Sequence, residues 1–218
     1  HIVIMEDMNN IADVLQHLNY NTVTKKNIYT AFRAVETKLL LRKEKKSLLH
    51  FGVTHPLNDN AIYKAPIELK KENFTIQLII KPDSNQNTNA LLLGNMYEQN
   101  TGFAVRQKNQ NTNELIFMFG NGTQLISPAS FKVFQNQWNY IVITVNSGFV
   151  KIFNNGVLIH SNPLSDHLKN SKGPLIIGNP VGQINPFKGL IREVQIGNDS
   201  ISMPDILKNM EMLKEIKN

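Results

Sequence analysis

The chain has 218 residues, a formal net charge of +6 and no cysteine. The lack of cysteine excludes disulfide bridges and thiolate metal sites, and no apolar run reaches the ~18 residues of a membrane-spanning helix. The hydrophobic share of 41% is ordinary for a folded domain in water. We therefore expect a folded protein that does not insert into a membrane. Its positive charge is spread along the chain and does not by itself indicate a nucleic-acid surface.

Two helices are predicted before residue 47. Apolar residues recur at helical spacing over 11–18 and again over 28–39, and Thr24 is suited to cap the second helix, which runs to about Lys46. Such a helical hairpin could pack on a neighbouring domain, form oligomers or read DNA as a helix-turn-helix. DNA binding is the weakest of these interpretations, because the second helix is long for a recognition helix and lacks a dense basic face.

Strands are predicted from about residue 60 almost to the C-terminus. Turn-forming residues gather over 47–60 and indicate a domain boundary. Beyond it, alternating apolar residues predict strands over 74–82, 91–94, 102–108 and 115–119. A turn over 120–122 then returns the chain through Ile126, which closes another hairpin.

The segment from Trp138 to Ser161 is predicted to be a three-stranded meander. Its first strand has two alternating sets of residues, Tyr140, Val142 and Thr144 on one face and Ile141, Ile143 and Val145 on the other. Because both sets are largely apolar, we expect this strand to be covered on both sides, with Trp138 in the core. Asn155-Gly156 supplies the positive φ angles that a two-residue hairpin turn needs.

Two further strands and a helix are predicted in the C-terminal part. The strands are 175–178 and 187–197, and in the second of them Leu190, Val194 and Ile196 are expected to share a face with Arg192. Ser202 is suited to cap a helix that packs against the sandwich or the N-terminal hairpin. We predict a mainly β protein, an antiparallel jelly-roll β-sandwich with an N-terminal α-helical hairpin and a short C-terminal helix. The corresponding domains are 1–50, 51–201 and 202–218.

The order of these pieces resembles the laminin G-like, concanavalin A-like family of jelly-roll domains. The resemblance covers about residues 60–209 and implies two antiparallel sheets of six or seven strands each, while residues 1–50 stay unexplained. Six pieces carry it: the strand that ends in Lys81-Pro82, the aliphatic strand Leu91–Gly94, the strand led by Trp138, the Asn155-Gly156 hairpin, Pro174–Gly178, and Phe187–Gly189 leading to Ile191–Val194.

The residues that catalysis by this family requires are missing. Members that hydrolyse glucans carry a Glu-x-Asp-x-x-Glu strand, which puts two carboxylates within reach of one glycosidic bond, and the sequence has no such string. We expect no enzyme, no catalytic residue and no cofactor. Calcium stays a candidate because many relatives bind it through loop Asp and Asn oxygens. Asn58, Asp59 and Asp83 are residues of that type, but we assign no metal ligand.

A glycan site needs amide and hydroxyl groups for hydrogen bonds and an aromatic ring for the apolar face of the sugar. Arg106 alternates with Phe103 and Val105, so it is expected on an exposed sheet face. The chain has 29 asparagines, so each loop asparagine is also a candidate turn former. The five candidate ligand-binding residues are Asn95, Tyr97, Arg106, Asn121 and Asn185.

The leading interpretation is a non-catalytic recognition or adhesion module. It would bind a carbohydrate, as a lectin does, or a surface protein, within a bacterial or phage surface assembly outside the cell, on its surface or on a virion. One alternative is a structural virion or cell-surface protein. Its N-terminal helices would form homo-oligomers or attach the chain, and its jelly roll would lie on the surface of the assembly. The other is a DNA-binding helical hairpin fused to a ligand-sensing domain. Nucleic acid is not expected as a partner under the first two.

Overall fold

The computed structural model describes residues 47–52, 61–63, 67–96, 98–146, 148–178, 185 and 187–216. The predicted N-terminal helices, the candidate calcium ligands Asn58 and Asp59, and the candidate Tyr97 lie outside the described residues. The division at residue 50 stays a prediction, although a strand, β1 (Ser47–Gly52), crosses that position.

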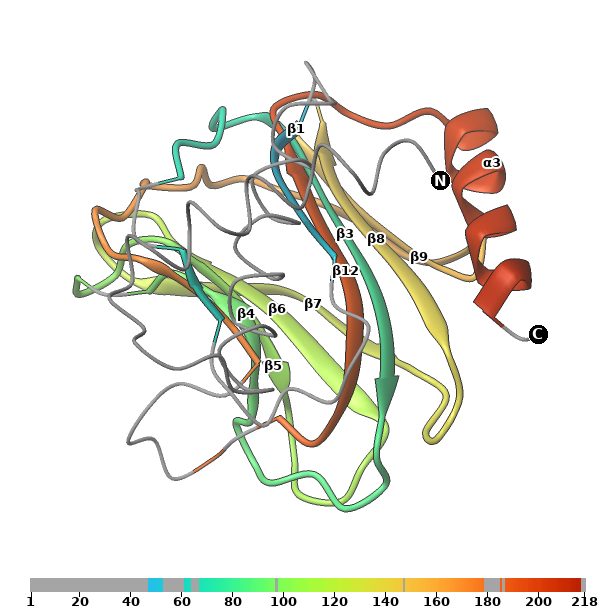
Figure 1. The fold of residues 1–218 in the computed structure, drawn as a ribbon. Helices are drawn as coiled ribbons and strands as arrows, with labels where there is room; N and C mark the ends of the chain where they lie inside the picture. Colours follow the sequence, from blue (N-terminus) through green and yellow to red (C-terminus); the bar gives the residue numbers. More distant parts are fainter. Residues whose placement is uncertain are drawn as a thin grey trace, which may run out of the picture.

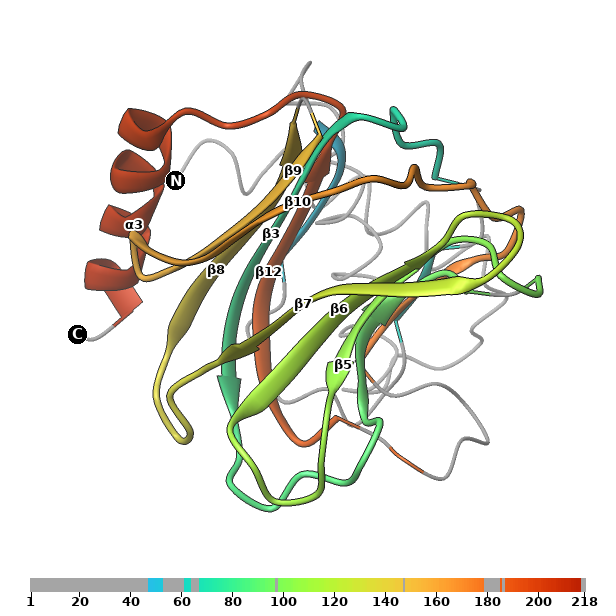
Figure 2. The same cartoon turned by 180° about the vertical axis from the view of Figure 1, so that it is seen from behind.

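The described residues form two antiparallel sheets that face each other as a sandwich (Figures 1 and 2). Sheet A contains, in spatial order, β1, β12 (Gly189–Gly197), β3 (Asn73–Pro82), β8 (Asn139–Asn146), β9 (Phe149–Asn154) and β10 (Val157–Pro163). Sheet B contains, in spatial order, β2 (Ala61–Tyr63), β11 (Leu175–Ile177), β4 (Leu91–Gly94), β5 (Phe103–Gln107), β6 (Glu114–Gly120) and β7 (Leu125–Lys132). Two six-stranded sheets agree with the predicted sandwich and are consistent with a jelly roll.

The main core fills the space between the sheets. Every second residue of β3 points into it, as the alternation from Phe74 to Ile80 predicts. From the opposite sheet, Phe103 and Val105 enter the same cluster, and the rings of Phe74 and Phe117 lie with centroids 6.5 Å apart. This core fixes both sheets, so the side chains on their outer faces stand on a rigid support.

A second apolar cluster covers the outer face of sheet A. Helix α3 (Met203–Ile216) lies outside β8 and β9 (Figure 1), and Ile206 is buried there together with Ile79, Tyr140 and Val142. Ser202 caps the helix by accepting a hydrogen bond from the Asp205 N–H at 3.3 Å. The two-sided burial predicted for β8 is thereby confirmed. Trp138 belongs to this second cluster, where it is partly buried, and not to the main core.

Polar contacts fix α3 in register with the sheet beneath it. Asn209 Nδ2 donates to Gln77 Oε1 at 3.1 Å, and the Tyr140 hydroxyl donates to the same oxygen. Burial raises the pKa of Tyr140 far above its usual value, so its hydroxyl stays a donor at any ordinary pH. The helix therefore closes this face with matched apolar and polar contacts.

The predicted face of the last strand is wrong in part. The core residues of β12 are Ile191, Val194 and Ile196, whereas Leu190 and Arg192 are only half-buried and do not belong to the core cluster. The pairing of β12 with β3 shifts register between Ile191 and Glu193, which marks a β-bulge. A bulge adds one residue to a strand and reverses the alternation beyond it, so a strict period of two could not place these side chains.

The edge strand β10 exposes consecutive apolar residues. Val157, Leu158 and Ile159 are 63%, 49% and 40% exposed. The strand pairs with β9, and His160 Nε2 lies 3.2 Å from the Pro128 carbonyl oxygen of β7. That contact joins the two sheets at this edge of the sandwich.

Candidate functional site

The outer face of sheet B is built from rows of paired residues. In one row Gly94 lies opposite Ala104 and Ala104 opposite Met118; in the next, Leu91 lies opposite Arg106 and Arg106 opposite Ile116. Glycine and alanine have the smallest side chains. The sheet surface therefore lies lower at Gly94 and Ala104 than at the neighbouring Leu91 and Arg106. A methyl group at Gly94 would come within 2.8 Å of the Phe103 carbonyl oxygen, which shows how closely β4 and β5 approach there.

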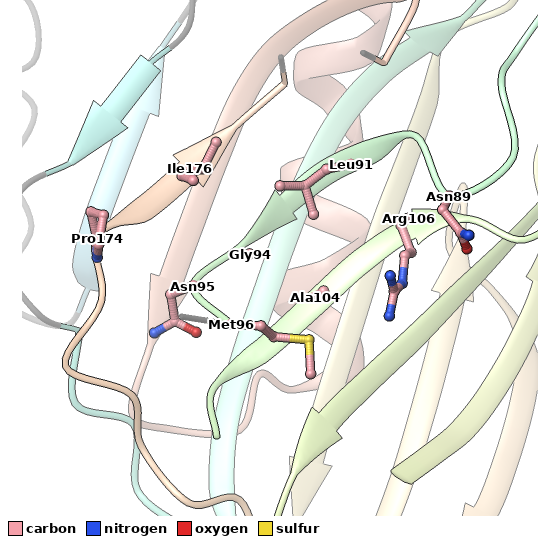
Figure 3. A pocket seen from close by; sticks show the side chains of 9 residues that line it. All are labelled: Asn89, Leu91, Gly94, Asn95, Met96, Ala104, Arg106, Pro174 and Ile176. Atoms are coloured by element: carbon pink, nitrogen blue, oxygen red, sulfur yellow. The ribbon is translucent and has the colours of Figure 1, made fainter. Parts of the chain in front are cut away.

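This difference in side-chain size produces a pocket of ≈ 160 Å³. Figure 3 shows its lining side chains on β4, β5, β11 and the loops that flank them. They are Asn89, Leu91, Gly94, Asn95, Met96, Ala104, Arg106, Pro174 and Ile176. The lining is mixed in polarity, and its polar side chains are those of Asn89, Asn95 and Arg106. We call its apolar side chains the apolar floor: Leu91, Met96, Ala104, Pro174 and Ile176.

Arg106 is the charged residue of the pocket lining. Its Nε donates to the sulfur of Met118 at 2.8 Å, and Nη2 donates to the same atom. No carboxylate of a described residue forms an ion pair with it. Burial lowers the pKa of the guanidinium, yet arginine stays protonated in proteins. The pocket therefore holds a positive charge that the described residues do not neutralise.

Asn89 and Asn95 line the pocket in different roles. Asn95 is buried, and its Oδ1 accepts a hydrogen bond from the Phe103 N–H at 2.9 Å, so this oxygen holds β5 against β4. Asn89 is exposed, and its φ of 59° places it in the left-handed region that asparagine tolerates. Its N–H donates to the Gln107 carbonyl oxygen at 3.1 Å, which fixes the turn beside β5. The Asn89 side-chain amide is thus presented beside Arg106.

The structure brings two of the five predicted site residues together, Asn95 and Arg106. Asn121 lies elsewhere and stabilises its own turn: its Oδ1 accepts from the N–H groups of Thr123 and Gln124, each at 2.9 Å, and its Nδ2 donates to Asp166 Oδ1 at 3.0 Å. Asn185 is half-buried in the connection between β11 and β12 and does not line the pocket. Asn89, Ala104 and Ile176 were missed, because only the strand pairing reveals that they meet.

A polar group lies beyond Arg106 on the same face. Lys108 Nζ lies 2.9 Å from Glu114 Oε1, and the Ser130 hydroxyl donates to that oxygen at 2.5 Å. The hydrogen bond from Ser130, followed by that from Lys108, holds the pKa of Glu114 below its usual value. Lys108 is therefore already neutralised, unlike Arg106.

The described residues contain no group of three or more His, Asp or Glu side chains that could hold a metal ion. Asp83, the calcium candidate that the structure describes, is exposed at the end of β3. In the same part of the chain, no helix has the length and apolar content needed to cross a membrane.

The chain belongs to the concanavalin A-like lectin/glucanases superfamily, whose family model matches residues 57–207. This match confirms the resemblance inferred from the order of six sequence pieces. A comparison with curated protein sequences found no match.

Several solved structures share the fold. Domain 4 of an extracellular family 43 arabinanase from Geobacillus stearothermophilus, in complex with arabinotriose, is 18% identical, with a TM-score of 0.55 over 68% of this chain and 71% of that chain. The botulinum neurotoxin serotype D binding domain is 17% identical, with a TM-score of 0.56 over 76% and 51%. A botulinum neurotoxin type C structure, described as interacting with two ganglioside molecules, is 23% identical, with a TM-score of 0.51 over 65% and 36%. The chain thus spans about half or less of these toxin chains, and identities this low show the fold alone.

Proposed function

We propose that the chain is a non-catalytic glycan-recognition module that binds its ligand on the outer face of sheet B. The observation that carries the proposal is the pocket around Ala104, which combines an apolar floor with Arg106, whose charge no described carboxylate neutralises. The fold adds support, since structures that share it include a domain in complex with arabinotriose and toxin binding domains, one described with gangliosides.

The pocket offers the chemistry that a sugar needs. Sugar hydroxyls exchange hydrogen bonds with amide and guanidinium groups, here those of Asn89 and Arg106, while the C–H face of the ring packs on apolar side chains. Leu91 and Ile176 supply such a surface. Tyr97 directly follows Met96, which lines the pocket, and we keep Tyr97 as the proposed aromatic contact. The described lining offers no pair of carboxylates for glycoside hydrolysis.

The first experiment fills the pocket. Ala104→Phe puts a ring into the hollow, and we expect it to abolish binding on a glycan array; the matched control is Ser127→Phe, which adds the same ring at an exposed position of β7 outside the pocket. Thermal unfolding of both variants checks that they fold. Equal binding by the two variants, whether retained or lost, would contradict a site at Ala104.

A second pair of variants removes an amide without straining the backbone. Asn89→Gly is the test variant, because glycine adopts the φ of 59° without strain. Asn136→Gly is the control: it makes the same change at a φ of 56°, in the turn before β8 and far from the pocket along the chain. One lost neutral hydrogen bond should weaken binding by about 2- to 10-fold in the first variant. The second should bind like the unmodified protein.

The wider setting is also a proposal: a bacterial or phage surface assembly, outside the cell or on a virion, to which residues 1–50 attach the sandwich. The structural alternative, in which those residues form homo-oligomers, predicts an oligomer when light scattering follows size exclusion of the full chain, and a monomer would remove it. A DNA-binding segment predicts a salt-dependent shift of duplex DNA. No shift at low salt would discard that role.

A further inference from the structure

Among the described residues, Arg106 has none of the oxygen partners that a half-buried guanidinium normally has. Arginine offers five N–H donors in a planar fork, and oxyanions are its preferred acceptors. The partner that the structure gives it is the sulfur of Met118, which is a weak acceptor. Partial burial removes part of its hydration, and that loss is offset when an anion binds.

The neighbouring charges do not supply that anion. Glu114 lies on the adjacent strand, but its carboxylate is engaged by Lys108 and Ser130. The described residues that line the pocket include no aspartate and no glutamate. From the described lining, a ligand that enters the pocket therefore meets a cation, an amide at Asn89 and an apolar floor, and it meets no carboxylate that would repel an acid.

The size of the pocket limits which part of a ligand it can take. Its ≈ 160 Å³ is well below the roughly 300–1,000 Å³ of pockets that enclose drug-sized ligands. It can hold one planar acidic group and part of the ring that carries it, while the rest of a glycan stays outside. A carboxylate attached directly to a sugar carbon fits this description, because it keeps the ring close to Leu91 and Ile176.

We infer that the ligand is an acidic glycan whose carboxylate binds the Arg106 guanidinium in a bidentate pair, with the ring of that sugar on the apolar floor. This inference rests on the proposed function, and it adds the chemical class of the ligand. Such a ligand could be a sialic acid or a uronic acid, which share the carboxylate on a ring carbon.

The test uses the full chain and a glycan array with matched pairs. Sialylated glycans are compared with their desialylated forms, uronic acids with their carboxyl-reduced forms, and sulfated glycans are included as a second kind of acid. We expect binding to the carboxylate-bearing member of at least one pair. Arg106→Gln should weaken that binding by about 10- to 100-fold, the effect of losing a charged hydrogen-bonded pair, and Arg106→Lys should restore only part of it, since an ammonium lacks the planar fork.

Two control variants separate this site from general charge. Lys132→Gln removes a positive charge from β7, opposite Glu114. Arg192→Gln removes an arginine from β12, which belongs to the other sheet. Both should bind like the unmodified protein. Thermal unfolding verifies that all variants are folded.

The outcomes distinguish this inference from the proposed function. Binding to neutral or sulfated glycans alone, or an undiminished affinity of Arg106→Gln for carboxylate-bearing glycans, would overturn the acidic-sugar assignment. If Ala104→Phe still abolished binding in that case, the proposed glycan site would stand and only its assignment to an acidic sugar would fall. No binding to any glycan would overturn both.

Discussion

The outer faces of the two sheets differ in what covers them. On sheet A, Ile79, Tyr140 and Val142 form an apolar surface that α3 closes with Ile206. On sheet B, the corresponding face carries Arg106 in a pocket with an apolar floor, together with the Lys108–Glu114–Ser130 group, and no described helix covers it (Figure 2). Within the described part of the chain, one outer face is thus closed by a helix, whereas the other carries a pocket.

The side chains on an outer face indicate where a site can lie in such a sandwich. Large apolar residues on an outer face require a cover, because exposed apolar surface is costly. Small residues beside a charged one, such as Gly94 and Ala104 beside Arg106, leave a hollow that no core side chain fills. Substitutions on sheet A should therefore change the free energy of unfolding, and substitutions in the pocket should change binding.

The largest effect on stability is expected at the centre of the cover. Ile206→Ala removes a side chain that is 1% exposed and should lower the free energy of unfolding by about 2–5 kcal/mol. The control, Leu207→Ala, changes the next residue of the same helix, which is 50% exposed, and should cost much less. Chemical denaturation measures both. Equal costs would show that α3 does not contribute to stability through its buried face.

A smaller effect is expected where the β9–β10 turn meets the helix. Gly156 and Gly148 both have a φ of 77°, so an alanine at either position carries the cost of a left-handed residue, about 1–2 kcal/mol. At Gly156 the added methyl group would also lie 2.4 Å from the Met210 sulfur, whereas at Gly148 the nearest atom is 3.7 Å away. Gly156→Ala should therefore be less stable than Gly148→Ala by about 1 kcal/mol or more. Unfolding midpoints that coincide would show that Met210 moves aside at no cost.

The smallest effect is expected on the outer face of sheet B. The pKa of Glu114 is lowered in the folded chain, so its carboxylate adds stability above the unfolded pKa of about 4.3, and this contribution is lost as the pH falls through the folded value. Glu114→Gln should cost under about 1 kcal/mol at neutral pH and less in acid. The control is Glu98→Gln, at an exposed loop position. Thermal unfolding at several pH values gives both curves, and a cost that does not shrink in acid would contradict an ionic origin.

The architecture was largely predictable from the sequence, since it depends on local patterns. The alternation in β3 and β8 indicated which residues enter the core, and Asn155-Gly156 marked a turn that the structure confirms with positive φ at both residues. The alternation failed in β12, where a bulge adds one residue. The extent of β7 was missed as well, because Pro128 is unusual inside a strand, although it is tolerated at a sheet edge.

The candidate site was predictable only in part, because a pocket depends on pairing between strands. Alternation placed Arg106 on an exposed face, but the hollow beside it requires Gly94 to lie opposite Ala104, and this register cannot be read from either strand alone. The asparagines are difficult for another reason, because the sequence offers too many candidates. All five non-glycine residues with positive φ in the described ranges are asparagines. Asn121 stabilises a turn in another way, through its side-chain oxygen. Asparagine type alone therefore does not distinguish a turn former from a ligand-binding residue.

The exposed edge of β10 has a consequence for how the protein associates at high concentration. Among the described strands, none pairs with the outer edge of β10, which presents Val157, Leu158 and Ile159. Such an edge is a template for another strand, and natural edges usually avoid this with charged residues or proline. If the full chain self-associates, this edge of the sandwich is one surface to test. An oligomer seen in solution should first be tested with Leu158→Lys, which puts a charge on this edge. If the oligomer persists in that variant, it can be attributed to the N-terminal segment.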